Sequence, residues 1–319
     1  MNITEIFDLH CDTPFEMYHK KLPLDSKELD GGLSEFDGFS KATQIFAVWS
    51  DKDVGGQQNF IDFFPTVTNL EREIEKHKDV RFCTSREDLD ENERIKIILS
   101  VEGADLLCAN TSRLYELYGR GVRLLTLMWR DENCAGGAHN TEKGLSEFGK
   151  TLVRECEKLG IIIDLSHASR QTFIDVASES TKPFVATHSN AYSVCPHTRN
   201  LTDDEFLEIN RKGGIVGVNF HPPFLIQGAQ SEDYTPDELI DALCEHIIYF
   251  LSLGGEKTVC LGADRDGIPH IDGYTPTRNA IKLYEALLKK NIEEKIIKDI
   301  FGDNAKRFFE THLPSKGRI

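Results

Sequence analysis

The chain has 319 residues and a formal net charge of −16, because 53 Asp and Glu outnumber 37 Lys and Arg. This charge argues against nucleic acid or an anionic membrane as a partner, and an anionic substrate would need a local basic anchor. No signal-like segment and no run of eighteen apolar residues is readable, so we expect a cytoplasmic protein without membrane contact. The 8 cysteines form no CxxC pair and are expected to be reduced and structural.

Short β-rich runs alternate regularly with amphipathic segments along the chain. The eight runs cover residues 6–10, 42–50, 95–103, 121–129, 160–167, 183–189, 214–220 and 258–264. Their nearly continuous apolar character is typical of parallel strands that are covered on both faces. Predicted helices cover residues 60–78, 112–118, 146–159, 169–178, 203–212, 236–253, 278–290, 292–300 and 303–310.

This alternation favours an α/β fold of the (β/α)₈ TIM-barrel type over a doubly wound sheet, since no Gly-rich phosphate loop follows any strand. No internal repeat or linker interrupts the pattern, so we predict a single domain over residues 1–319. The longest irregular stretches, 21–39 and 131–144, follow the first and fourth strands. In a barrel those connections lie on the face that carries function.

Residues able to bind a metal close five of the predicted strands. They are His10 and Asp12 after the first, Glu102 after the third, His167 after the fifth, His188 after the sixth and Asp264 after the eighth. The C-terminal ends of barrel strands meet at one mouth, so these side chains should face a common centre. Side chains two apart on an extended segment point the same way, which puts His10 with Asp12 and turns Cys11 away.

The donor set favours zinc over calcium or magnesium, because it mixes imidazole nitrogens with carboxylates. Six groups suit a pair of ions about 3.5 Å apart, bridged by a carboxylate and a water, better than one tetrahedral ion. Taken singly, each residue has a structural explanation, such as a helix cap for Glu102 or an Asx turn for Asp264. Only their joint placement favours a metal site. The remaining histidines considered are expected to be structural or solvated: His19, His77, His139, His246, His270 and His312.

Five motifs in this order closely resemble the membrane (renal) dipeptidase family of zinc metallopeptidases. They are DLHCDTP, SVEGAD, DLSHAS, THSNAYSV followed by TRNLTDDE, and LGADRDGIP. The resemblance runs from about residue 6 to the GDNAKRFF stretch and implies an amidohydrolase-type barrel. It also implies two zinc ions, with His10 and Asp12 on one, His167 and His188 on the other, and Glu102 bridging both.

The resemblance further implies a reaction, in which a metal-bridging hydroxide hydrolyses a dipeptide that can carry a D-residue at its C-terminal position. Asp264 matches the acid that moves a proton from the water to the leaving amine, and Arg199 matches the arginine that holds the substrate carboxylate. A planar guanidinium suits a carboxylate and supplies the expected basic anchor. Family members tend to form homodimers, so a homodimer is expected here.

Two positions depart from the family pattern. Trp129 stands where the family often has a histidine that contacts the substrate, and an indole can donate a hydrogen bond but cannot titrate. Arg265 stands where an aromatic residue is common, and its charge would favour ionised Asp264 if the side chain points inward. Trp49, at the end of the second strand, is expected to wall the substrate pocket.

Two other functions remain open from the sequence. One is a hydrolase that uses the same metal pair on another amide or on a lactone. The other is a barrel that binds a metal or a small molecule without catalysis, for which the proton-carrying Asp264 would have no use.

Overall fold

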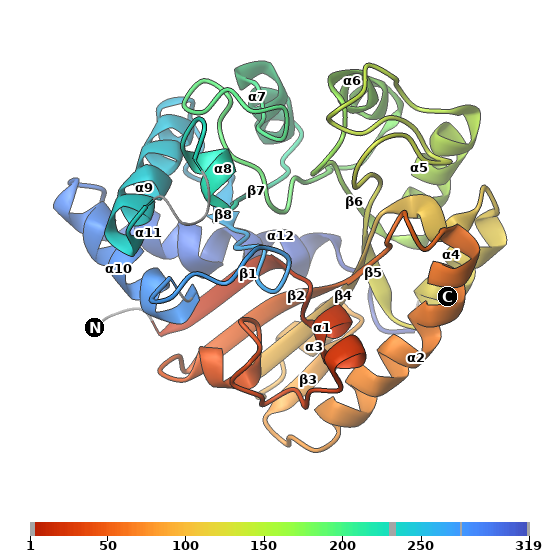
Figure 1. Cartoon of the computed structure of the whole chain (residues 1–319), viewed down its shortest axis with the longest axis horizontal. Coiled ribbons are helices and arrows are strands. Elements are labelled where there is room, and N and C mark those ends of the chain that lie inside the picture. The colour runs from red at the N-terminus through yellow and green to blue at the C-terminus, as the bar shows by residue number, and fades with distance from the viewer. Residues whose placement is uncertain (1–3, 230–233, 275, 318–319) are drawn as a thin grey trace.

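The computed structural model describes residues 4–229, 234–274 and 276–317. Parallel strands occupy the centre and helices surround them (Figure 1). The strands are β1 Glu5–Cys11, β2 Lys41–Trp49, β3 Val80–Cys83, β4 Ile95–Glu102, β5 Val122–Thr126, β6 Ile162–Asp164, β7 Val216–Val218 and β8 Val259–Leu261. Hydrogen bonding joins them in the order β6-β5-β4-β2-β1-β8-β7, which confirms the predicted barrel-type fold.

The predicted strand 183–189 is wrong as a regular strand, although its segment still closes the ring between β6 and β7. Isolated parallel bridges join Asp164 to Val185 and Ala186 to Val216. Beyond them, side chains replace strand partners, because the Thr187 amide donates to the Asp164 carboxylate (2.9 Å). The next amide along the chain likewise donates to a serine hydroxyl. On the β6 side the backbone ladder therefore stops just where the side chains of the site begin, whereas on the β7 side the Ser189 amide still donates to the carbonyl of Gly217 (2.8 Å).

Strand β3 was not predicted, because its four residues are too few for a periodic signal. It pairs with residues 95–98 of β4, whereas β5 pairs with residues 99–102. Strand β2 pairs with one edge of β4 over the whole of 95–102. The opposite edge of β4 is therefore occupied first by β3 and then by β5. β3 is thus an addition beside the ring rather than a member of it.

The nine predicted helices are all present, with shifted ends. The helices are α1 Thr13–Lys20, α2 Gly56–Ile74, α3 Arg86–Leu89, α4 Thr111–Gly119, α5 Glu147–Leu159, α6 Arg170–Glu179, α7 Asp203–Arg211, α8 Pro222–Leu225, α9 Pro236–Ser252, α10 Pro276–Lys289, α11 Glu294–Lys298 and α12 Asn304–His312. Hydroxyl caps fix several starts: Ser146, Ser169, Thr202 and Thr235 each accept a hydrogen bond from the amide three residues on. Helices α1, α3 and α8, which are all short, were not predicted.

The barrel interior is filled by one buried cluster to which every member of the ring contributes. Its members include Phe7, Leu9, Ile45, Ile98, Leu124, Ile162, Val185, Ile215 and Cys260. Helix α12 adds Ala305, Phe308 and Phe309, and it crosses behind the strands in Figure 1. Since Phe309 stacks on Phe7 at the N-terminal part of β1 (5.1 Å between ring centroids), α12 closes that end of the barrel. The opposite end is left for the site.

The substitution Phe309→Ala should therefore lower stability without disturbing the opposite end of the barrel. Removing a buried phenylalanine from such a cluster costs roughly 3–5 kcal/mol. Urea unfolding followed by circular dichroism would measure the loss. A loss below about 1 kcal/mol would show that the cluster is not the closed core described here.

A bulge in β1 decides which residues face the barrel interior. Asp8 pairs with Gln44 and Cys11 with Phe46, so Leu9 and His10 together oppose one residue of β2. Leu9 belongs to the interior cluster, and strict alternation would then turn His10 outward. The extra residue restores an inward His10.

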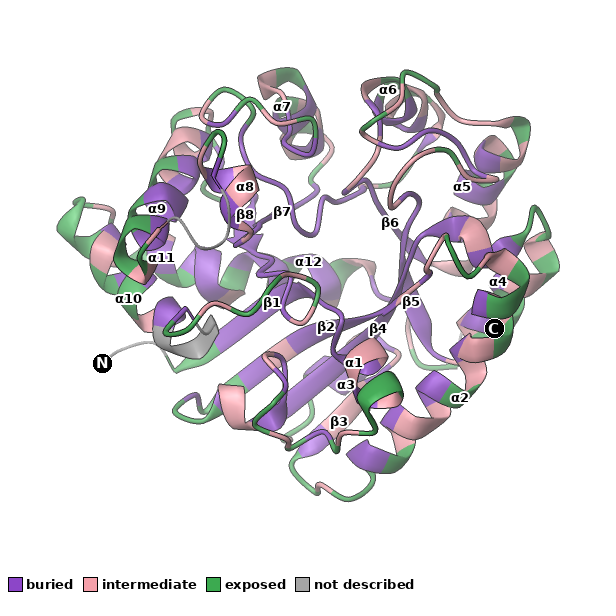
Figure 2. Cartoon of the chain, in the orientation of Figure 1, coloured by how far each residue is buried: buried purple, intermediate pink, exposed green. Residues whose placement is uncertain are grey.

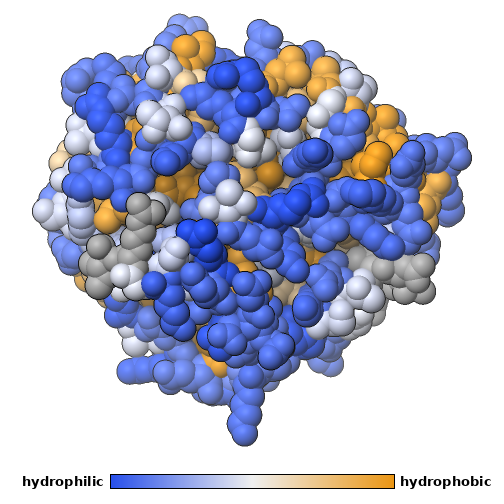
Figure 3. All heavy atoms as spheres, turned by 180° about the vertical axis from the view of Figure 1, so that it is seen from behind, coloured by the Kyte–Doolittle hydropathy of each residue, from blue (hydrophilic) through white to orange (hydrophobic). Residues whose placement is uncertain are grey.

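The surface agrees with the charged composition. The reverse face is covered mostly by hydrophilic side chains, with apolar ones in small groups (Figure 3). The strands and inner helix faces are buried, whereas the outer helix faces alternate between exposed and half-buried residues (Figure 2). No helix in the described part of the chain is long and apolar enough to cross a bilayer. All eight cysteines are free thiols.

Candidate active site

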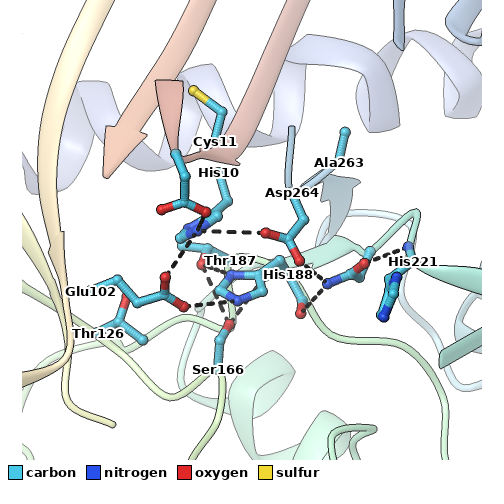
Figure 4. A network of polar contacts seen from close by, with 12 residues as sticks. His10, Cys11, Glu102, Thr126, Ser166, Thr187, His188, His221, Ala263 and Asp264 are labelled. Carbon is cyan, nitrogen blue, oxygen red and sulfur yellow. Dashed lines mark hydrogen bonds and ion pairs between the residues drawn. The ribbon is translucent and has the colours of Figure 1, made fainter. Parts of the chain in front are cut away.

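The strand ends bring the predicted metal-binding residues into one cluster (Figure 4). His10 Nε2 lies 3.5 Å from Asp12 Oδ2, 3.6 Å from Glu102 Oε2 and 3.8 Å from Asp264 Oδ1. The sulfur of Cys11 points away from this cluster, as expected. Three of the predicted carboxylates, those of Asp12, Glu102 and Asp264, therefore surround the imidazole of His10.

The second half of the cluster lies on the other side of Glu102. The Oε1 atom of Glu102 is 2.9 Å from His167 Nε2 and 3.4 Å from His188 Nε2, while the Oε2 atom of Glu102 faces His10. The two oxygens of one carboxylate thus face two separate groups of residues. This is the arrangement that a bridging ligand requires.

The donor atoms of the cluster fit a cation. Both ring nitrogens of His10 and the Oδ1 atom of Asp12 are buried without a hydrogen-bond partner among the described residues. The Nε2 atoms of His167 and His188 face each other at 2.9 Å. His167 Nδ1 donates to the carbonyl of Trp129 (2.7 Å), so its Nε2 lone pair is directed into the cluster. Buried nitrogens and carboxylates left in this state match the ligands of a divalent metal ion.

The electrostatics of the cluster point the same way. Burial works to lower the pKa of His10, but Glu102 and Asp12 raise it well above its ordinary value. Burial and the charge of Glu102 raise the pKa of Asp12 to about 7. Against its burial, the nearby imidazoles His10 and His167 hold the pKa of Glu102 well below its usual range. The carboxylates therefore repel one another and compete for positive charge, which a bound cation would supply.

Three residues at the strand ends have a left-handed backbone. The φ angles are +68° at His167, +62° at Asp264 and +60° at Asp266. Such a conformation costs a residue with a side chain about 1 kcal/mol or more, and it persists where the surrounding structure enforces it. Two of these three residues belong to the cluster, so the backbone is held in this form to aim their side chains.

Gly267 shows how tightly the loop after β8 is packed against the carboxylates. A Cβ atom at this position would lie 2.2 Å from Asp12 Oδ2 and 2.6 Å from Asp264 Oδ1. Gly267→Ala should therefore displace both carboxylates and lower metal affinity and activity by at least about tenfold. Chelator titration measures the metal affinity, and an activity assay measures the second quantity. Unchanged values for both would contradict the packing described here.

A cavity of about 410 Å³ opens next to the cluster. Its wall includes Phe15, Trp49 and Trp129 together with Asp12, Glu102, His167 and Asp264. The indoles of Trp49 and Trp129 pack edge to face with 4.7 Å between centroids, and Phe15 packs against Trp49. Trp49 thus lies in the pocket wall, as predicted, and Trp129 presents an apolar ring beside it.

Arg199 is a buried guanidinium next to the cluster. Its Nη2 atom donates to the carbonyl of His188 (3.2 Å), and its Cζ atom lies 5.3 Å from the ring centroid of Phe224, which lines the cavity. In the described structure Nε and Nη1 have no hydrogen-bond partner. Burial lowers the pKa of Arg199 to about 10, so the group is still charged at neutral pH. Two unpartnered nitrogens of a buried cation, which together carry three N–H donors, are suited to bind a carboxylate.

Arg265 does not point inward. Its Nη2 atom lies 3.7 Å from Asp8 Oδ2, and the guanidinium lies over the ring of Phe36. Burial works to raise the pKa of Asp264, and the charges of His188 and His10 lower it instead. The condition under which Arg265 was expected to favour ionised Asp264 is therefore not met.

Some histidines near the site were missed or misjudged. His221 lines the cavity, and its buried Nδ1 atom has no partner in the described ranges, although it directly follows the predicted seventh strand and could have been found by the same rule as the others. His139 was expected to be solvated, but it is half-buried, with its ring 6.0 Å from that of His167. Burial and the charge of Arg199 lower the pKa of His139 to about 2. His246 is structural as expected, since both of its nitrogens are hydrogen-bonded to backbone.

The sequence matches the family described as membrane dipeptidase, peptidase family M19, over residues 1–315. This chain belongs to the membrane dipeptidase family. It is therefore a metallodipeptidase-type enzyme, and the cluster provides groups that can hold the metal of that family.

Solved structures share the fold over nearly the whole length. A crystal structure of the M19 metallopeptidase called dipeptidase AC matches with a TM-score of 0.87 and 25% identity, covering 99% of this chain and 100% of that one. A metallopeptidase from Rhodobacter sphaeroides, liganded with a phosphinate mimic of the dipeptide L-Ala-D-Ala, also gives a TM-score of 0.87, with 23% identity over 98% of this chain and 100% of its own. The membrane dipeptidase fold is thus shown for this chain.

Curated relatives are similar over most of the chain. A protein of Klebsiella pneumoniae, named for its place in the pqqA 5′ region, is 31% identical over 70% of this chain and 86% of its own length. An uncharacterised dipeptidase of Schizosaccharomyces pombe is 31% identical over 68% of this chain, and the matched part covers 53% of the length of that protein.

Proposed function

We propose that this membrane dipeptidase family member is a zinc-dependent dipeptidase that cleaves free-ended dipeptides, including those with a C-terminal D-residue. The observation that carries the proposal is the pairing of the cluster with Arg199. The buried guanidinium lies next to a group of carboxylates and imidazoles, but it forms no ion pair with a described residue, and its Nε and Nη1 nitrogens have no hydrogen-bond partner there. The free C-terminal carboxylate of a short peptide has the required charge and shape.

The proposed metal centre uses five ligands around two zinc ions. His10 and Asp12 would hold one ion, His167 and His188 would hold the other, and Glu102 would be shared between them. When bound there, zinc would acidify a water molecule and polarise the carbonyl of the scissile bond. The mixed donor set supports zinc, and metal analysis of protein purified without added ions would test it.

The chain's own groups position the substrate and move the proton. Arg199 binds the C-terminal carboxylate, and Trp129 with Trp49 covers the peptide and excludes water. Asp264 takes the proton of the attacking water and delivers it to the leaving amine. Its Oδ2 atom accepts a hydrogen bond from Asn219 Nδ2 (2.9 Å), which leaves Oδ1 directed at the cluster.

Support for a C-terminal D-residue comes from the Rhodobacter sphaeroides metallopeptidase, whose bound ligand mimics L-Ala-D-Ala. That enzyme shares the fold of this chain at 23% identity. We also propose a homodimer, which light scattering of the purified protein would test.

A panel of L,L and L,D dipeptides tests the proposed function, with N-acyl amides and lactones as comparison substrates. We expect cleavage of free dipeptides, including L-Ala-D-Ala, that a chelator abolishes and added zinc restores. Hydrolysis of only the amides or lactones would favour the other metal-hydrolase function. Absence of any turnover by the zinc-loaded protein would contradict the proposal.

A further inference from the structure

We infer that Asp164 is a positioning residue that fixes the tautomer of His188 through the hydroxyl of Thr187. The inference rests on the proposed function, since it concerns how this chain prepares His188 to bind a metal ion. Neither Asp164 nor Thr187 faces the cavity, and both are fully buried below the cluster.

Asp164 is surrounded by donors. Its Oδ1 atom accepts hydrogen bonds from the amides of Ser166 (3.0 Å) and Thr187 (2.9 Å). Its Oδ2 atom accepts from the hydroxyls of Thr126 and Thr187, each at 2.6 Å. With four donors directed at it, the carboxylate is held as an anion, and anionic acceptors make the shorter and stronger hydrogen bonds.

The single proton of Thr187 settles the direction of the next hydrogen bond. A hydroxyl has one proton and two lone pairs, and at 2.6 Å the Thr187 proton must lie toward the Asp164 anion, because two acceptors would otherwise repel. Thr187 Oγ1 also lies 2.8 Å from His188 Nδ1. It can only accept there, so Nδ1 carries the hydrogen.

The result is a lone pair on His188 Nε2, which lies 3.4 Å from Glu102 Oε1 and faces His167 (Figure 4). His167 reaches the same state by a different route, because its Nδ1 donates to a backbone carbonyl. A carbonyl can only accept, whereas a hydroxyl can turn. His188 therefore needs the carboxylate behind Thr187 to hold that hydroxyl in one orientation.

The substitution Asp164→Asn tests this role of Asp164 directly. It keeps the shape of the side chain but replaces one hydrogen-bond acceptor, a carboxylate oxygen, with a donor, an NH₂ group. The amide oxygen of the new side chain must replace Oδ1, which accepts from two backbone amides, so its NH₂ group faces the threonine hydroxyls. The Thr187 hydroxyl then accepts a hydrogen bond from that NH₂ group and turns its own proton toward His188 Nδ1. The hydrogen of the imidazole moves to Nε2 and blocks the lone pair that a metal needs.

Three further variants separate tautomer control from packing. Thr187→Val removes the hydroxyl, whereas Thr187→Ser retains it. Thr126→Val is the matched control, since it removes a hydrogen bond of the same length to the same carboxylate without touching His188. The full-length protein is used throughout, and circular dichroism reports whether each variant folds.

Zinc affinity, measured by chelator competition, should fall about 10- to 100-fold in Asp164→Asn and Thr187→Val and change less than about threefold in Thr187→Ser and Thr126→Val. Equal losses in Thr126→Val and Thr187→Val, or no loss in Thr187→Val, would overturn the inference. If Asp164→Asn does not fold, the comparison of zinc affinity between Thr187→Val and Thr187→Ser is sufficient to test the inference.

Nitrogen-15 spectra of histidine-labelled, metal-free protein at neutral pH give a readout that does not depend on activity or metal. The His188 signals, assigned by their absence in His188→Gln, should show hydrogen on Nδ1 in the wild type and on Nε2 in Asp164→Asn. The same tautomer in both proteins would overturn the inference. A wild type that binds no zinc but shows this switch would instead contradict the proposed function alone.

Discussion

Asp264→Asn should lower kcat by about 10²- to 10⁴-fold, the usual contribution of a positioned acid–base group. The asparagine can keep the hydrogen bond from Asn219, because its amide oxygen can take the place of Oδ2. It cannot accept and release the proton that the leaving amine requires. The other five groups of the cluster remain, so metal content should be retained, as measured by elemental analysis.

The matched control is Asp272→Asn, the same substitution on the same connection between β8 and α10. Asp272 is fully exposed, and its recorded ion pair is with His270, outside the cluster. Its kcat should equal that of the wild type. Turnover by Asp264→Asn at the control rate would refute the proton-carrying role, and loss of its metal would assign Asp264 to the ligands instead.

Arg199→Ala should reduce kcat/KM for a free dipeptide by about 10- to 100-fold, mainly through a higher KM. A hydrogen bond to a charged group is worth roughly 1.5–3 kcal/mol, and each 1.4 kcal/mol is about tenfold. The same dipeptide as its C-terminal amide lacks the charge, so Arg199→Ala should hardly change the hydrolysis of that amide. Steady-state kinetics on the two substrates give the comparison.

Arg199→Lys separates charge from geometry, because lysine keeps the charge but loses the planar fork. We expect kcat/KM of Arg199→Lys for the free dipeptide to lie between the values of the wild type and Arg199→Ala. Since the buried guanidinium makes a single recorded hydrogen bond, its removal should not lower the Tm of the substrate-free protein. Equal losses on the acid and the amide would show that Arg199 does not bind the carboxylate.

The alternation of apolar runs predicted most of the barrel because parallel strands and amphipathic helices leave strong periodic signals. It failed where side chains replace backbone partners, as at Thr187, and where a strand is too short to show a period, as in β3. The closure of the barrel by α12 was also not predictable, because an amphipathic helix does not reveal which surface it covers. Such packing depends on long-range contacts like that of Phe309 with Phe7.

The candidate site was more predictable than the fold around it, because strand ends converge in any barrel of this type. Even so, the inward direction of His10 depends on a bulge in β1 that could not be predicted from the sequence. The outward direction of Arg265 is set by Asp8 and Phe36, which belong to other parts of the chain. The chain of hydrogen bonds behind His188 likewise joins strand ends that are neighbours only in the folded barrel.

Anomalous diffraction from crystals of the zinc-loaded protein, recorded on both sides of the zinc absorption edge, tests the central claim most directly. Two zinc peaks are expected, one between His10 and Asp12 and one between His167 and His188, with Glu102 contributing one oxygen to each. A single peak, or peaks away from Glu102, would contradict it.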